Sequence, residues 1–164
     1  NGGIDGLKAA CPTAEVIATL NLAWDYATAK AAMEDILANY PQIDGILSQG
    51  GAMTQAAIDA YVEQGLPLVP MTGEASNGFL RVWLEQADNG LQSMAFCNPT
   101  WISVTALDTA IRILNGEEVE KEITVTVPPV TLETAKDLYR PDVNDSFWVH
   151  TYLSDAEIKE LFPK

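Results

Sequence analysis

Residues 43–73, IDGILSQGGAMTQAAIDAYVEQGLPLVPMTG, decide the fold of this chain. An apolar run at residues 43–48 is followed by the turn Gln49-Gly50-Gly51, and apolar residues then recur at helical spacing between residues 52 and 64. Gly65 suits the end of a helix, and a second apolar run follows at residues 66–71. A strand, a helix and a strand in this order predict a βαβ unit with parallel strands.

The same alternation continues on both sides of this unit. Upstream, an apolar run at 15–20 predicts a strand, and Asp25 caps a helix predicted over 26–40, which Pro41 ends. Downstream, the pattern predicts a helix over 79–87, a strand over 91–97 and a helix from Pro99 to Asn115. Strand and helix thus alternate four times. The predicted fold class is α/β, a three-layer parallel sheet with helices on both faces.

The pattern changes after Gly116. Residues 123–127 predict an alternating strand that Pro128 ends, residues 131–134 a helical turn, and a capping box at Ser154 a last helix that reaches Phe162. We therefore divide the chain into a ligand-binding α/β lobe at 1–127 and a tail with short helices at 128–164. Because the chain opens directly on a helical stretch at residues 2–10, we expect it to start inside a longer protein.

Composition and charge exclude several classes of function. Hydrophobic residues make up 48% of the 164 residues, enough for a buried core, and charged residues make up 20%. The net charge of −14 repels phosphate backbones and anionic lipid, so nucleic acid is not an expected partner. No apolar run reaches the ~18 residues that cross a bilayer. Two cysteines, Cys11 and Cys97, and one histidine, His150, predict neither a disulfide scaffold nor a metal site, and leave open whether the cysteines pair.

Ligands of open parallel sheets bind at the carboxyl ends of the strands. Here those ends are residues 21–25, 49–51, 72–77 and 98–101, which hold amides, hydroxyls, glycines, two tryptophans and the carboxylate of Glu74. Neutral hydrogen-bonding groups beside an aromatic ring suit a polyhydroxylated ligand. Each residue also has a structural alternative: Trp24 as a core plug, Gly50 as a turn residue, Glu74 as a partner of a helix dipole, and Asn98 as a helix cap.

Catalysis finds little support in the sequence. Motifs of serine hydrolases, phosphate-binding loops and zinc proteases are missing, and His150 lies outside the predicted strand ends. Cys97 ends a predicted strand, where a buried and inert thiol is the expected state. The sequence therefore predicts no catalytic residue and no cofactor.

Three segments together resemble the periplasmic sugar-binding proteins of ABC importers, in particular the ribose-type, type I group. They are WDYATAK at 24–30, the run from Met33 to Ile46, and VPMTG at 69–73, within a match that covers most of residues 1–127. The resemblance implies two α/β lobes, joined by a three-stranded hinge, that close on a sugar or polyol. This chain would be the carboxyl-terminal half, its partner a membrane permease, and its location periplasmic or extracellular, with a lipid anchor as one option for the full-length protein.

The resemblance also implies where the ligand binds. Trp24, before the capping Asp25, matches the aromatic residue that stacks on the sugar, and the remaining matched or adjacent positions are Gln49, Gly50, Thr72, Gly73, Glu74, Cys97 and Asn98. The chain departs from the family at Gly50, where an asparagine is expected, at Thr72, where a carboxylate is expected, and near Gly3, where an arginine is expected. These departures argue against ribose itself.

The resemblance further implies that the helix from Pro99 to Asn115 packs on the other lobe. Its apolar residues, including Ile102, Leu107, Ile111 and Leu114, would then lack cover in this chain, and we expect the isolated chain to dimerise or to exchange that helix. Two other functions share this architecture. They are the effector domain of a LacI-like repressor, which a DNA-reading module before residue 1 would favour, and a small α/β enzyme.

Overall fold

A parallel sheet forms the centre of the fold in this computed structural model, which describes residues 2–164. Strand β1 (Met71–Glu74) pairs in parallel with β2 (Ser93–Phe96), in the register Met71 to Ser93 and Glu74 to Phe96. On the other side of β1, Ile46 forms a parallel bridge with Met71, and beyond β2, Ala95 forms an antiparallel bridge with Val130. The α/β class with a parallel sheet is confirmed. The strand predicted at 66–71 is displaced, because β1 begins at Met71 and includes residues 72–74, which the sequence pattern places after the strand, and β2 is shorter than the predicted 91–97.

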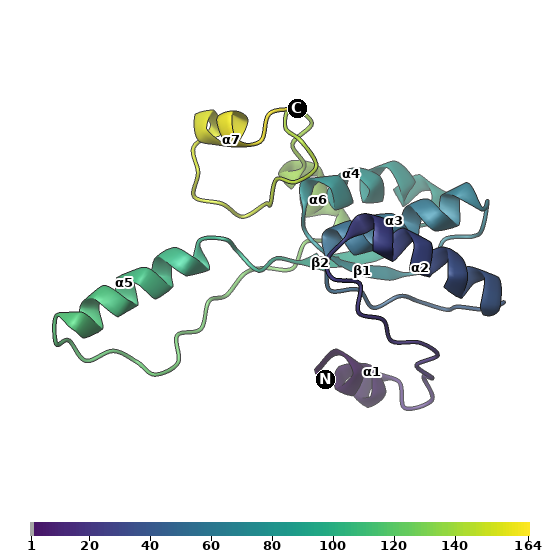
Figure 1. The fold of residues 1–164 in the computed structure, drawn as a ribbon, viewed down its shortest axis with the longest axis horizontal. Coiled ribbons are helices and arrows are strands. Elements are labelled where there is room, and N and C mark those ends of the chain that lie inside the picture. The colour runs from purple at the N-terminus through teal and green to yellow at the C-terminus, as the bar shows by residue number, and fades with distance from the viewer. Residues whose placement is uncertain (1) are drawn as a thin grey trace.

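Three helices cover one face of this sheet (Figure 1). They are α2 (Tyr26–Asn39), α3 (Gly51–Glu63) and α4 (Asn77–Gln86), and α3 packs between the other two and against β1. The core between helices and sheet contains Ile58, Phe79, Leu80 and Trp83, all almost fully buried. A 3-10 turn, η1 (Ala87–Asn89), connects α4 to the approach of β2. The predicted helices of this region form as expected, and Gly65 takes the left-handed conformation with φ 66°.

The predicted strand at residues 15–20 does not form. A groove of about 520 Å³ separates this segment from residues 43–48, and its walls include Val16, Ile17 and Ile46. In the described part of the chain, residues 15–20 and 43–48 form no backbone hydrogen bonds with each other. The backbone pairing of residues 43–48 with the β1 segment is through Ile46, whose N–H donates to the Pro70 carbonyl at 2.9 Å and whose carbonyl accepts from the Thr72 N–H at 3.0 Å. Helix α1 (Gly2–Ala10) also lies next to the segment at 43–48, because Gly3 packs against the side chain of Leu47.

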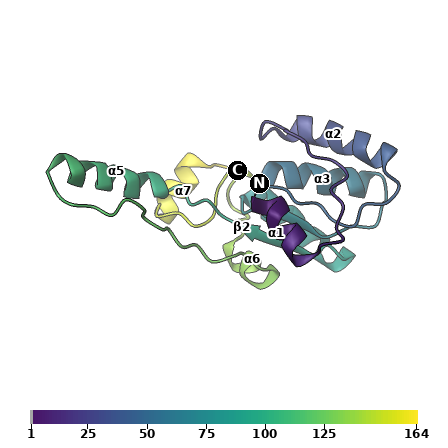
Figure 2. The same cartoon turned by 90° about the horizontal axis from the view of Figure 1, so that it is seen from below.

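Helix α5 (Ile102–Leu114) extends away from the body as an arm (Figures 1 and 2). It begins three residues later than Pro99, because residues 99–101 form a turn in which Ile102 N–H donates to the Pro99 carbonyl. Among residues 2–164, none of the α5 side chains is buried, and Leu107 is 63% exposed. The predicted strand at 123–127 is extended but unpaired and runs back along the arm to Val130.

The tail from residue 131 contains α6 (Leu132–Leu138) and α7 (Asp155–Leu161), each with a reciprocal capping box. The side chain of Asn77, which is 1% exposed, holds the tail to the start of α4. Its amide nitrogen donates to the carbonyls of Arg140, Val143 and Asn144 at 2.8–3.3 Å, and its amide oxygen accepts from Arg140 N–H at 2.9 Å. The division into a lobe at 1–127 and a tail at 128–164 remains a prediction, since the tail packs on α4 of the lobe.

Asn77→Ala is expected to release the tail. The change leaves buried backbone groups of residues 140–144 without partners, and we expect the free energy of unfolding to fall by about 2–3 kcal/mol. Denaturant unfolding measures this loss, and hydrogen exchange should show faster exchange at residues 140–149. Asn89→Ala, which removes an exposed amide bonded only to Gln86, is the control and should change little. Equal losses in the two variants would contradict the role of Asn77.

Candidate functional site

The indole ring of Trp24 lies exposed at the carboxyl end of the sheet, resting on Gly50. Trp24 is 61% exposed, and a Cβ built at Gly50 would lie 2.8 Å from its Cε3 atom and 2.6 Å from Cε of Met53. Position 50 must therefore be glycine if the ring is to keep this seat. An asparagine at position 50, which the family resemblance would place there, would displace the ring.

The backbone that presents Trp24 is strained. Ala23 and Trp24 have φ values of 50° and 61°, the left-handed region, which costs side-chain-bearing residues roughly 1–2 kcal/mol each. Asp25 then caps α2, because its Oδ1 accepts from the Thr28 N–H at 2.7 Å and from the Thr28 hydroxyl at 2.6 Å. These bonds lower the pKa of Asp25, so its carboxylate is ionised and committed to the helix start. The strained backbone at residues 23–24, fixed by the cap of α2, therefore holds the Trp24 ring exposed to solvent.

Gln49, just after the segment at 43–48, and Thr72, within β1, have different roles. Gln49 is exposed and borders the same groove as Trp24. The Thr72 hydroxyl bonds to both the N–H and the carbonyl of Ser48 at 3.0 Å, and so joins the two strand ends. Gly50 caps α3 through its carbonyl, which accepts from the Thr54 N–H and hydroxyl. Gln49 is thus available to a ligand, whereas the polar atoms of Thr72 and Gly50 already serve the fold.

Glu74 ends β1 and supplies the carboxylate of the site. Gly51 approaches it so closely that a Cβ there would lie 2.5 Å from the Glu74 carbonyl oxygen. The backbone N–H of Asn98 donates to the Glu74 carboxylate. Burial raises the pKa of Glu74, and the bond from Asn98 opposes that rise. Asn98 therefore does not cap α5 as its alternative role proposed; its backbone holds Glu74, and its side chain is exposed.

Two of the proposed residues face the interior. Gly73 is buried against the ring of Phe79, on the helix side of the sheet. Cys97 is buried, and its Sγ donates to the Val149 carbonyl at 3.2 Å. Burial and the nearby Glu74 charge raise the pKa of the Cys97 thiol to about 11, so it is protonated and a poor nucleophile at neutral pH. Cys11 and Cys97 are both free thiols.

The contacts form a continuous row along the carboxyl edge of the sheet. Trp24 touches Gly50, Gly51 touches Glu74, and Glu74 bonds to Asn98. The tail extends this row, because Val149 N–H donates to the Ala75 carbonyl at 3.3 Å while its carbonyl accepts from Cys97. Sequence reasoning missed the tail here, since a contact between residues 97 and 149 leaves no local pattern. It also missed Phe96, the partner of Glu74 in the sheet register.

This edge presents hydrogen-bonding groups beside an aromatic ring. It offers the exposed indole ring of Trp24, the exposed amides of Gln49 and Asn98, and the carboxylate of Glu74, whereas the carboxylate of Asp25 caps α2. Within residues 2–164, no group of three histidine, cysteine or acidic side chains is arranged to hold a metal ion. Over the same residues, no helix combines the length and apolar character required to span a membrane.

Comparison with solved structures finds the same fold in sugar-bound receptors. An ABC transporter solute-binding protein from Actinobacillus succinogenes with bound D-allose is 24% identical and matches with a TM-score of 0.65 over 83% of this chain and 48% of its own. The arabinose-transporter binding protein of Shewanella sp. ANA-3, bound to L-arabinofuranose, is 20% identical, with a TM-score of 0.69 over 83% of this chain and 46% of its own.

A third match is a carbohydrate-transporter binding protein from Agrobacterium radiobacter in complex with D-arabinose. It is 20% identical and has a TM-score of 0.67 over 98% of this chain and 48% of its own. This chain therefore spans about half the length of these proteins, and at such identities the likeness shows the fold. No curated protein matches the chain.

The family model described as a periplasmic binding protein domain matches residues 1–118, which include the sheet, the helices α1 to α5 and every proposed site residue. The chain belongs to this periplasmic binding protein family.

Proposed function

We propose that this chain is one lobe of an extracytoplasmic receptor that binds a sugar or polyol for an ABC importer, without catalysis. A second lobe, joined through the segments at the base of the α5 arm, would close over the ligand. The bound and closed receptor would then dock on a membrane permease. The protein would act in the periplasm or outside the cell, free or held by a lipid anchor.

The observation that carries this proposal is the exposed indole ring of Trp24 on its glycine seat. Leaving a tryptophan exposed is unfavourable, because its apolar surface stays in water. Here two residues in the left-handed conformation and the helix cap at Asp25 hold the Trp24 ring in that exposed position. Gly50 lies against the Cε3 and Cζ3 atoms of the ring, and Trp24 remains 61% exposed, which leaves ring surface for the C–H groups of a sugar. The structures similar to this chain in fold include proteins bound to D-allose and D-arabinose.

The remaining residues have distinct proposed roles around that ring. Gln49, Asn98 and Glu74 would bind ligand hydroxyls through their side chains. Asp25, Gly50, Thr72, Gly73 and Cys97 would shape the site without touching the ligand through polar side-chain atoms, because those atoms are bonded inside the fold, buried or missing. With a net charge of −14 on the chain, a neutral ligand is favoured over an anionic one.

Trp24→Ala should weaken sugar binding. Removing the ring deletes the stacking surface, and we expect the affinity to fall at least tenfold, about 1.4 kcal/mol. The measurement is a thermal-shift screen of the protein carrying both lobes against D-allose, D-fucose, L-arabinose and D-arabinose. Leu161→Ala removes another side chain that is 61% exposed, in α7, and is the matched control. Unchanged thermal shifts in Trp24→Ala would refute the role of the ring.

Gly50→Ala tests the seat of the ring. A methyl group at this position meets Trp24 Cε3 and Met53 Cε well inside contact distance, so the indole must move. We expect the ¹⁹F resonance of fluorotryptophan-labelled Trp24 to shift and sugar affinity to drop several-fold. Gly6→Ala, where a Cβ has open space, should leave both unchanged. An unmoved resonance in Gly50→Ala would show that the ring does not rest on residue 50.

We also propose that the 164-residue chain alone dimerises through α5. Ile102, Leu107 and Leu114 are 43–85% exposed on a helix in which no side chain is buried among residues 2–164. Light scattering during size exclusion should give a mass that doubles as concentration rises, and Leu107→Glu should restore the monomer. A monomer at high concentration in the unmodified chain would contradict this proposal.

A further inference from the structure

We propose that Phe96 is a second ligand-contacting residue of the site, an aromatic platform that meets the C–H groups of a sugar beside the hydroxyl held by Glu74. This inference rests on the proposed sugar-binding function and adds a specificity-determining residue to it. It assigns the ligand an apolar face or methyl group next to a hydroxyl.

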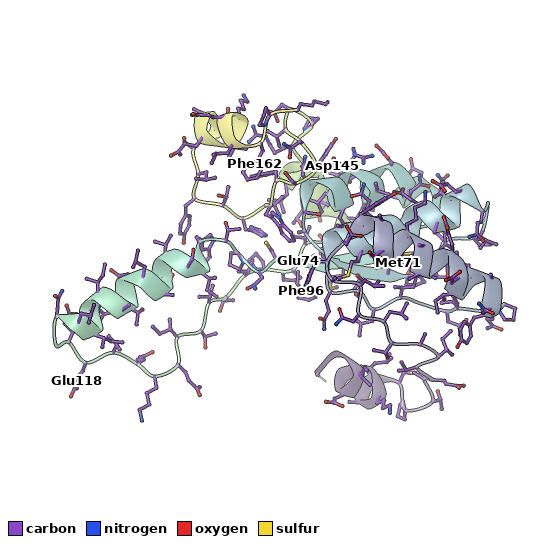
Figure 3. All side chains as sticks on the ribbon, viewed as in Figure 1. Met71, Glu74, Phe96, Glu118, Asp145 and Phe162 are labelled. Carbon is purple, nitrogen blue, oxygen red and sulfur yellow. The ribbon has the colours of Figure 1, made fainter. Side chains whose placement is uncertain are left out.

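The sheet register places Phe96 directly beside Glu74. In β1 the buried residues Met71 and Gly73 point to the helix side, and Thr72 and Glu74 point to the opposite face. In β2 Ala95 is buried, so Phe96 shares the face of Glu74, its register partner. Neighbouring strands lie about 4.8 Å apart, which brings the two side chains into contact range. Figure 3 shows both at the same end of the sheet, away from Met71.

Phe96 and Glu74 form the last residue pair between β1 and β2, at the carboxyl end of the sheet. Thr72 pairs with Met94 one step back. On the other side of β1, Gln49 follows the segment that bridges to β1 through Ile46 and Met71. Gln49, Glu74 and Phe96 thus lie at or just after the carboxyl ends of three neighbouring segments. The first two are polar residues already proposed to bind hydroxyls, and the third adds an apolar surface to the same row.

The backbone around Phe96 is fixed while its ring stays open. Its carbonyl accepts from the Ala75 N–H at 3.1 Å, and two residues later Asn98 N–H bonds to the Glu74 carboxylate. Phe96 is 57% exposed. A carboxylate held next to an exposed phenyl ring matches a sugar edge on which a hydroxyl and C–H groups alternate.

An alternative is that Phe96 packs on the second lobe and never meets the ligand. The two roles differ in what a truncation changes. A packing residue stabilises the protein without ligand, whereas a ligand contact changes affinity and leaves the melting temperature of the ligand-free protein nearly unaltered. Met94, 45% exposed on the same face and one step from the edge, is the matched control for surface packing.

The test compares Phe96→Ala, Phe96→Leu and Met94→Ala in the protein carrying both lobes. Calorimetric titration with D-allose, D-fucose, L-arabinose and D-arabinose gives the dissociation constants, and melting without sugar gives the stability. For each sugar that binds the unmodified protein, we expect Phe96→Ala to weaken affinity about tenfold, Phe96→Leu less, and Met94→Ala less than twofold.

The possible outcomes separate this inference from the function beneath it. Affinity retained in Phe96→Ala but lost in Trp24→Ala overturns the role of Phe96 alone. Equal effects of Phe96→Ala and Met94→Ala on melting without sugar, with affinity unchanged, assign Phe96 to packing and also overturn it. Failure of the unmodified protein to bind any of the sugars overturns the proposed function and this inference together.

Discussion

The parallel register of β1 and β2 is the constraint on which the site depends. Because both strands run in the same direction and pair from Met71–Ser93 to Glu74–Phe96, their carboxyl ends stop at one edge. The loops that leave this edge bring together residues far apart in the chain, from Trp24 to Val149. Antiparallel pairing would send consecutive loops to opposite ends and divide these residues between them.

The helices that start at this edge of the sheet differ in what covers their first residues. The start of α4 is covered by the tail, because the N–H groups of Asn77 and Gly78 donate to the carbonyls of Phe147 and Asp145. The Arg81–Asp145 ion pair at 2.9 Å reinforces this contact. The starts of α2 and α3 lie beside Trp24 and Gly50 instead. The tail thus covers the start of α4, away from the part of the edge where Trp24 is exposed.

Much of the fold is predictable from local pattern, and most of the site is not. Asp25 and Ser154 mark helix starts, because each bonds to a residue only three positions further along the chain. Pro41 and Gly65 mark helix ends, so these boundaries form as expected. Strand pairing is non-local: residues 15–20 have the composition of a strand but face a groove instead of a hydrogen-bonding neighbour.

The same reason limits prediction of individual side chains. The order of strands marks Trp24 and Glu74 as edge residues, but only the register shows that Phe96 is outward and Gly73 inward. Nothing near Cys97 in the sequence indicates Val149 as its partner, and the Asn77 contact joins residues more than sixty positions apart. Roles that depend on such distant contacts become visible only in three dimensions.

A crystal structure of the two-lobed protein with a bound sugar tests the central claim most directly. The account predicts the sugar ring stacked on the open face of Trp24 at van der Waals distance, about 3.5–4 Å, with its hydroxyls bonded to Gln49 and Glu74. A sugar bound away from this edge, or an indole ring turned into the protein interior, would contradict it.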